Sequence, residues 1–234
     1  MIHALADKIA TSEHPLVKPI ARLLKFPFNS LQLRLLYHQK NRDVIDFIAS
    51  LRKDNEVPLW NTELFQIYAC ALAARKLDGA LAEVGVYRGA TAKLISEANK
   101  GKRALHLFDT FEGLPKPDEI DTKHKEKQYA CSLEFVQNYL KHYHNIAFYK
   151  GLFQQTSHAV KNIRFSFVHL DVDLYRGTFD SLGFFYSRMV RGGIILSHDY
   201  STTPGVKAAF DEFFADKPEP LIELPTSQVL IVKL

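Results

Sequence analysis

Cysteine, methionine and tryptophan are scarce in this sequence, with two, two and one of them among 234 residues. Cys70 and Cys131 lie far apart in the chain and match no zinc-binding spacing, so we expect both to be small apolar residues of the interior. No apolar run reaches the roughly 18 residues of a transmembrane helix, and Asp7 and Lys8 interrupt the segment where a signal peptide needs an apolar core. These absences predict a cytoplasmic protein without disulfides.

Charge is unevenly distributed along the chain. Residues 1–42 hold seven basic and two acidic side chains, a net charge of +5, whereas the rest carries −1 of the total of +4. A nucleic-acid protein would place its basic residues on the main domain, so we expect no such partner. The basic arm has three possible roles: a solvated face, a lid or homo-oligomer contact, or weak attraction to an anionic membrane or an acidic glycan.

The N-terminal segment and the remainder differ in pattern. Residues 1–58 are interrupted by Pro15, Pro19, Pro27 and Pro58, which predicts a helical arm or lid made of short helices such as Leu16–Leu24. Residues 59–234 form the second predicted domain, which begins with a helix from about Asn61 to Leu77. After that helix, short apolar runs alternate with helical patterns.

Six strands are predicted, at Ala80–Val86, Ala104–Asp109, Ile146–Lys150, Phe165–Asp171, Gly193–Ser197 and Gln228–Lys233. Helices are predicted between them, at Thr91–Asn99, Ser132–His142, Thr156–Asn162, Thr178–Tyr186 and Val206–Phe214. This alternation is typical of an α/β fold with a doubly wound, mostly parallel sheet. The short junction at Pro225 and Thr226 predicts a hairpin and an antiparallel last strand, giving seven strands in all. In such sheets ligands bind beyond the carboxyl ends of the strands.

The first three strand ends have the residues of a nucleoside site. Strand one runs into a turn with Glu83, Gly85 and Gly89, and Thr91 follows at the start of a helix. The spacing differs from the glycine pattern of a dinucleotide fold, and Glu83 suits a cationic ammonium and sulfonium better than a pyrophosphate. Asp109 ends strand two and can accept both ribose hydroxyls. After strand three, Gly151 could admit an adenine and Phe153 could line it.

The fourth and fifth strand ends are acidic. Asp171 and Asp173 follow strand four, and alternation along an extended chain predicts that they share a face. His198 and Asp199 follow the neighbouring strand. The cluster of Asp171, Asp173, His198 and Asp199 therefore predicts a site for Mg²⁺ or Mn²⁺, with Asp171, His198 and Asp199 as the expected ligands. A cation of this kind acidifies a coordinated hydroxyl, and an adjacent carboxylate, ionised at neutral pH with an ordinary Asp pKa of about 3.9, takes the proton.

Taken together, these residues resemble the macrocin O-methyltransferase (TylF) family over about Ala80 to Phe214. The most specific strings are Phe108-Asp-Thr-Phe-Glu-Gly-Leu-Pro115 and His169-Leu-Asp-Val-Asp-Leu-Tyr175. The other matching strings are Glu83-Val-Gly-Val-Tyr-Arg-Gly89, Tyr149-Lys-Gly-Leu-Phe153, Arg191-Gly-Gly-Ile-Ile-Leu-Ser-His-Asp-Tyr200 and Gly205-Val-Lys-Ala-Ala-Phe-Asp-Glu-Phe213.

The resemblance implies a Rossmann-like class I methyltransferase fold, S-adenosylmethionine as methyl donor, and a divalent cation. It also implies a donor site that includes Tyr87, Thr110 and Asp171, with Asp171 a metal ligand as well and Asp173 the general base. The family usually has two acidic residues before the tyrosine that follows strand five, whereas this chain has His198 in the first place. An imidazole is a weaker ligand for Mg²⁺ than for Mn²⁺ or Zn²⁺.

These observations predict transfer of a methyl group to a hydroxyl of a small polar acceptor, such as a sugar or glycan. Two alternatives remain: an NAD-dependent oxidoreductase on the same sheet, and a non-catalytic methyltransferase-like module that binds a partner. The oxidoreductase would need a pyrophosphate turn, which is missing, and the Asp171–Asp173 pair argues against a module without catalysis.

Overall fold

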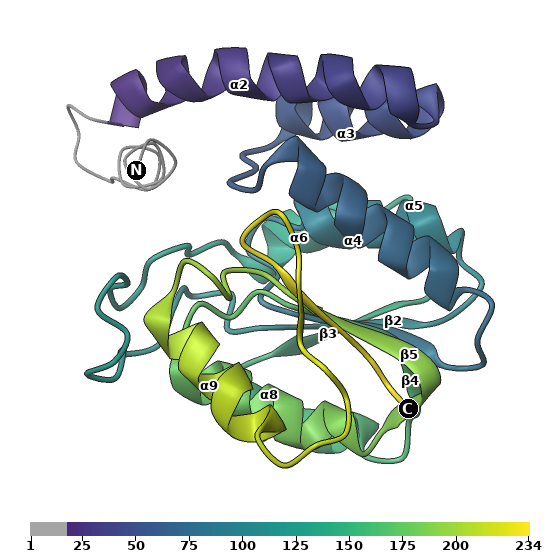
Figure 1. Cartoon of the computed structure of the whole chain (residues 1–234), viewed down its shortest axis with the longest axis vertical. Helices are drawn as coiled ribbons and strands as arrows, with labels where there is room; N and C mark the ends of the chain where they lie inside the picture. The colour runs from purple at the N-terminus through teal and green to yellow at the C-terminus, as the bar shows by residue number, and fades with distance from the viewer. Residues whose placement is uncertain (1–17) are drawn as a thin grey trace. The chain divides into compact units, whose positions relative to one another are not determined.

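The computed structural model describes residues 18–234, with side chains from residue 27 onward. It divides into two compact units (Figure 1). The described part of the first unit covers residues 18–54 and 58–65, and the second covers residues 55–57 and 66–234. The predicted domain boundary at residue 58 stays a prediction. Within the described residues, no helix combines the length and the apolar character that a bilayer crossing needs.

The first unit contains α2 (Lys18–Gln39), α3 (Arg42–Asp54) and the first turn of α4 (Asn61–Ala74). The prediction of short helices is wrong for residues 18–39, because α2 is continuous and has Pro27 inside it. An internal proline removes one backbone hydrogen bond and costs about 3 kcal/mol. Hydrogen bonds between α2 and the start of α4 offset part of this, since Asn61 Nδ2 donates to the Asn29 carbonyl at 3.0 Å and Asn61 N to Gln32 Oε1 at 3.2 Å. The first residues of the predicted Leu16–Leu24 helix lie outside the described part of the chain.

The second unit is built on one seven-stranded sheet in the order β3-β2-β1-β4-β5-β7-β6. Its strands are β1 (Ala80–Val84), β2 (Leu105–Asp109), β3 (Ile146–Lys150), β4 (Phe165–Leu170), β5 (Met189–Ser197), β6 (Ile222–Glu223) and β7 (Val229–Val232). The first five pair in parallel, and β7 runs antiparallel to both β5 and β6. This confirms the predicted α/β sheet with an antiparallel C-terminal strand.

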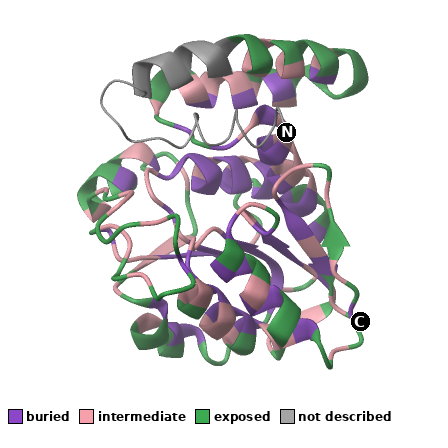
Figure 2. Ribbon diagram, turned by 60° about the vertical axis from the view of Figure 1, so that its left-hand side comes forward, coloured by how far each residue is buried: buried purple, intermediate pink, exposed green. Residues whose placement is uncertain are grey.

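Helices cover both faces of the sheet. They are α5 (Ala90–Asn99), α6 (Leu133–Tyr139), α7 (Phe153–Thr156), the 3-10 turn η1 (Ser157–Val160), α8 (Tyr175–Tyr186) and α9 (Pro204–Phe214). In Figure 1, α5 and α6 lie on one face, and α8 and α9 on the other. Every residue of β4 is buried, as a central parallel strand requires, and Figure 2 shows the buried residues following the sheet.

The order of the strands positions the functional residues. Strand β1 is central, because the chain first winds outward through β2 and β3 and then returns to β4 on the other side. The direction of winding therefore reverses between β1 and β4. Ligands of open α/β sheets bind at this reversal, beyond the carboxyl ends of the strands.

Candidate active site

The predicted residues at the strand ends lie side by side because backbone pairing continues one residue past the sheet. Gly85 N donates to the Phe108 carbonyl, Asp171 N to the Val84 carbonyl, and His198 N to the Leu170 carbonyl, each at 2.9 Å. The turns after β1, β4 and β5 thus begin at the same level along the sheet. The turn from Gly85 to Gly89, here called the glycine turn, therefore lies next to Asp171, His198 and Asp199, here called the acidic cluster. Both stand at the carboxyl ends of the parallel strands.

Gly85 makes this close meeting possible. Its φ is +85°, and a Cβ atom at this position would lie 1.8 Å from the carbonyl oxygen of Asp171. The approach of the neighbouring strand end therefore excludes a side chain at this position. Gly89, at φ +81°, precedes α5, and Tyr87 between them has φ +49°. Their contact with a methyl donor stays a prediction.

Glu83 lies below this turn and is not positioned as expected. Its side chain is fully enclosed, and Oε1 is 2.8 Å from Nδ1 of His169, which is equally buried. Burial raises the pKa of Glu83, and His169 and the Thr91 hydroxyl oppose that shift. The expectation that Glu83 meets a cationic ligand directly is therefore corrected. In this structure Glu83 joins β1 to β4 in the interior, and the buried Thr91 supports it from α5.

Asp109 holds the glycine turn in place. Its Oδ2 accepts hydrogen bonds from the backbone N–H groups of Val86 at 2.7 Å and Tyr87 at 2.9 Å, and its Oδ1 accepts one from Phe111 at 2.7 Å. Next to it, the Thr110 hydroxyl donates to the Gly113 carbonyl at 2.7 Å. Ribose binding by Asp109 stays a prediction, but the carboxylate already has a structural task that the sequence did not reveal.

Two predicted donor-site residues, Gly151 and Phe153, follow β3 and differ in their surroundings. Gly151 N donates to the Asp109 carbonyl at 3.0 Å, and its φ of +138° is a conformation that favours glycine. Phe153 was predicted to line the adenine, yet only 6% of it is exposed. Its ring packs against Phe108 and Phe185, with centroids 5.2 and 5.3 Å away. We therefore correct its assignment to a core residue of α7, turned inward by the aromatic cluster between β2 and α8.

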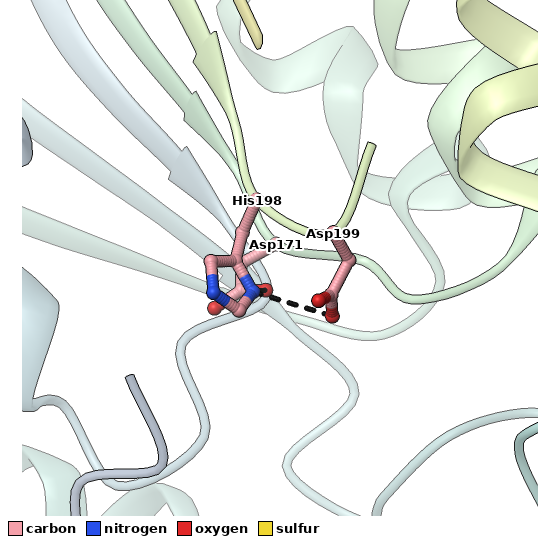
Figure 3. A group of neighbouring side chains, drawn as sticks. All are labelled: Asp171, His198 and Asp199. Atoms are coloured by element: carbon pink, nitrogen blue, oxygen red, sulfur yellow. Dashed lines mark ion pairs between the residues drawn. The ribbon is translucent and has the colours of Figure 1, made fainter. Parts of the chain in front are cut away.

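The acidic cluster brings three potential metal ligands together. Nδ1 of His198 lies 3.2 Å from Oδ1 of Asp171 and 3.2 Å from Oδ2 of Asp199. Figure 3 shows the imidazole directed at the Asp199 carboxylate, with Asp171 close by. Among the described residues, one ligand atom from each of the three lies within 4.8 Å of the others. Two carboxylates and an imidazole in this arrangement fit a divalent cation such as Mn²⁺ or Mg²⁺.

Asp173 reaches the cluster by a different route from the one predicted. Strand β4 ends at Leu170, and Asp173 has φ +62°, so it does not continue an extended chain beside Asp171. The side chain is 12% exposed and hydrogen-bonds to Asp199. Burial and the carboxylates of Asp171 and Asp199 raise its pKa well above the ordinary value that we assumed.

The pKa of Asp199 shifts in the opposite direction to that of Asp173. Burial raises its pKa, but the His198 imidazole and a hydrogen bond from the Thr202 hydroxyl, 2.8 Å from Oδ1, outweigh this and lower it. The hydrogen bond between the two side chains contributes to both shifts, raising the pKa of Asp173 and lowering that of Asp199. A raised pKa makes Asp173 a stronger base once it is ionised, which suits proton acceptance from a hydroxyl.

Sequence reasoning missed two residues, both in the loop between β2 and α6. Asp121 is buried, and its Oδ1 accepts a hydrogen bond from Tyr175 N at 2.9 Å, at the start of α8. His124 places Nε2 3.7 Å from Oδ1 of Asp173. Burial lowers the pKa of His124, although the nearby charges of Asp199 and Asp121 oppose this. No motif marks either residue, because both stand in a charged loop whose pattern is that of solvent-exposed chain.

Known protein families include a match to most of this chain. A sequence profile of the macrocin-O-methyltransferase (TylF) family matches residues 63–230. The chain belongs to this family. The TylF match contains the glycine turn, the acidic cluster and the loop with Asp121 and His124.

Two curated relatives of the chain come from Streptomyces. The chain is 27% identical over 155 residues to demethyldecarbamoylnovobiocin O-methyltransferase of Streptomyces niveus, which is 59% of each protein. It is 27% identical over 141 residues to 8-demethyl-8-(2,3-dimethoxy-alpha-L-rhamnosyl)-tetracenomycin-C 4'-O-methyltransferase of Streptomyces olivaceus, covering 53% of this chain and 54% of that protein. The chain thus spans somewhat over half the length of these relatives. The solved O-methyltransferase NovP superposes with a TM-score of 0.67 at 26% identity, over 76% of this chain and 81% of that one.

Proposed function

We propose that this chain transfers a methyl group from S-adenosylmethionine to a hydroxyl of a small polar acceptor, and that the acceptor is a sugar or a glycosylated molecule. The observation that carries the proposal is the meeting of the glycine turn and the acidic cluster, one backbone step past β1, β4 and β5. Membership of the TylF family supports the methyltransferase over the NAD-dependent alternative. The rhamnosyl group in the name of one relative supports a sugar acceptor.

The donor would lie over the glycine turn, which runs through Gly85, Tyr87 and Gly89 with positive φ at each and is fixed by Asp109. Gly151 borders the same edge at the end of β3. Glu83, Thr91 and Phe153 would shape this site from below, because all three are buried. Thr110 fixes the next turn through Gly113.

Asp171, His198 and Asp199 would hold a divalent cation, which supplies positive charge that makes a hydroxyl more acidic. Asp173 stands beside this group and would accept the proton of the acceptor hydroxyl as the methyl group transfers. The hydrogen bond between Asp173 and Asp199 keeps Asp173 close to the three proposed metal ligands. The three ligands come from two adjacent strand ends, which fixes them relative to the turn after β1.

The test combines binding and turnover. Isothermal titration with S-adenosylhomocysteine measures donor binding, and labelled donor with a panel of sugars and glycosides, with and without Mg²⁺ or Mn²⁺, measures transfer. Asp173→Asn should keep donor binding and lower kcat by roughly 10²–10⁴-fold, as expected for loss of a general base. Asp180→Asn, on α8 and hydrogen-bonded to Gln154, is the control and should leave kcat within about twofold. Wild-type protein that binds no S-adenosylhomocysteine would refute the donor assignment.

A further inference from the structure

His124 is a buried imidazole close to the proposed general base. Its side chain is 8% exposed, and among the described residues neither ring nitrogen makes a hydrogen bond of normal geometry, although the Gln128 side chain is near enough to raise the pKa of the imidazole slightly against the effect of burial. A buried polar group left unsatisfied costs about 1–3 kcal/mol, so such groups in native proteins need a reason. In an enzyme, a ligand that supplies the missing hydrogen bond is a common reason.

The imidazole of His124 faces Asp173, the proposed general base. Nε2 of His124 lies 3.7 Å from Oδ1 of Asp173, which is too far for a hydrogen bond and near enough for both to contact one small molecule. Asp173 is the residue to which the proposed function gives the acceptor proton. A group held by His124 would therefore stand next to the hydroxyl that is methylated.

The loop that bears His124 is fixed at two levels. Two backbone hydrogen bonds close the base of the loop. Leu114 N donates to the Gln128 carbonyl, and Lys127 N donates to the Leu114 carbonyl, both at 2.8 Å. Further out, Asp121 binds the first N–H of α8, and His124 N donates to the Asp121 carbonyl at 3.3 Å. The imidazole is thus held in place before any ligand arrives, which lowers the entropic cost of binding.

Two tyrosine rings extend this surface toward the glycine turn. The ring of Tyr129 lies 6.3 Å from that of His124 and 5.5 Å from that of Tyr87, centroid to centroid. The backbones of Tyr87, Tyr129 and Asp173 all have positive φ, a conformation that costs about 1–3 kcal/mol at a non-glycine residue and concentrates at functional sites. An aromatic wall that ends in polar groups suits a ring-shaped ligand with several hydroxyls.

We propose that His124 binds the acceptor, donating to or accepting from the hydroxyl next to the one that is methylated, with Tyr129 along the side of the ring. This rests on the proposed function and extends it by assigning the acceptor to cyclic compounds with neighbouring hydroxyl groups. A neutral imidazole has one donor and one acceptor nitrogen, and a hydroxyl can pair with either. Specificity would then come from the loop between β2 and α6.

The direct test is NMR of the full chain with ¹⁵N-labelled histidine. The ring signals of His124 are identified as those missing from His124→Gln, and S-adenosylhomocysteine is added to saturation. Methyl α-L-rhamnopyranoside and methyl α-D-glucopyranoside are then titrated separately at millimolar concentrations. A saturable shift of the His124 signals, with those of the exposed His158 unmoved, is the expected result. Absence of a His124 shift with both sugars overturns the assignment, while the separate response to S-adenosylhomocysteine shows whether the donor proposal stands.

Kinetics provide a second readout. With an acceptor that the wild type turns over, His124→Ala should raise the acceptor KM by about 10-fold or more, the equivalent of one lost hydrogen bond in a buried site. Its affinity for S-adenosylhomocysteine should stay within about twofold, and His124→Gln should restore part of the KM. His158→Ala, on η1, is the matched control. A fall in donor affinity equal to the change in KM would show a purely structural role and overturn the proposal.

Discussion

Gly85→Ala is the substitution for which the structure makes the sharpest prediction. The new Cβ would lie 1.8 Å from the Asp171 carbonyl oxygen and 2.6 Å from its carbonyl carbon, distances that real side chains do not reach. Either the glycine turn or the start of the acidic cluster must move by more than an ångström. The matched control is Gly101→Ala, since Gly101 also has a positive φ, +66°, but a Cβ there would meet nothing within 4 Å.

The two variants separate backbone strain from steric conflict. A left-handed conformation costs an alanine about 1–2 kcal/mol, and Gly101→Ala should lose only this. Gly85→Ala should lose at least about 2 kcal/mol more, because displacement of Asp171 breaks the bond from Asp171 N to the Val84 carbonyl and leaves buried polar groups unpaired.

Urea denaturation with an unchanged m-value measures this difference, and titration with S-adenosylhomocysteine measures its effect on the site. Gly85→Ala should bind the donor analogue at least about tenfold more weakly, whereas Gly101→Ala should bind it normally. If both variants lose the same stability and both bind normally, the turn and the cluster are not packed together as described, and the reasoning fails.

Three further predictions concern single side chains. Asp109→Asn should weaken S-adenosylhomocysteine binding and lower the free energy of unfolding in urea by about 1–3 kcal/mol. The reason is that an amide cannot accept hydrogen bonds from all three backbone N–H groups that the carboxylate accepts, and unchanged stability would contradict this. His198→Asp, which replaces an imidazole with a hard oxygen ligand, should raise the affinity for Mg²⁺ relative to Mn²⁺ in isothermal titration, and an unchanged ratio would argue against His198 as a ligand. Burial raises the pKa of Glu219, but Lys233 and Tyr186 outweigh this and lower the pKa to about 2. The stabilisation is therefore present above the ordinary pKa and is lost as the pH falls toward about 2, so Glu219→Gln should cost about 1–2 kcal/mol at pH 7 and progressively less below about pH 4.5, as measured by denaturation across that range.

Most strand positions could be predicted because buried parallel strands are continuous apolar runs. The predicted Ile146–Lys150 matches β3, and four other predicted strands differ from the structure by one or two residues at one or both ends. Strand β5 begins four residues earlier than predicted. Its Arg191-Gly192-Gly193 segment has no apolar signal, and a register irregularity with β4 accommodates it, with Gly192 at φ +78°.

The positions of site residues could be predicted only where the sheet imposes them. Asp171 and His198 stand one residue past paired strands, so the topology places them together. Asp173 lies beyond the sheet, where alternation no longer applies and a positive φ turns the chain. His124 depends on the anchoring of its loop by Asp121 to Tyr175, which is 54 residues away in sequence. Such a contact leaves no local pattern.

The anchoring of this loop also separates stability from selectivity. Asp121 fits against Gly205 so closely that a Cβ on the glycine would lie 1.9 Å from its Oδ1, and the same oxygen accepts the first N–H of α8. Residues 122–126, between Asp121 and the paired base of the loop, are largely exposed apart from His124. If the proposed acceptor role of His124 holds, redesign of this chain for new acceptors should vary this short stretch and keep Asp121 and Gly205 constant, so that libraries change what is recognised without changing how the protein folds.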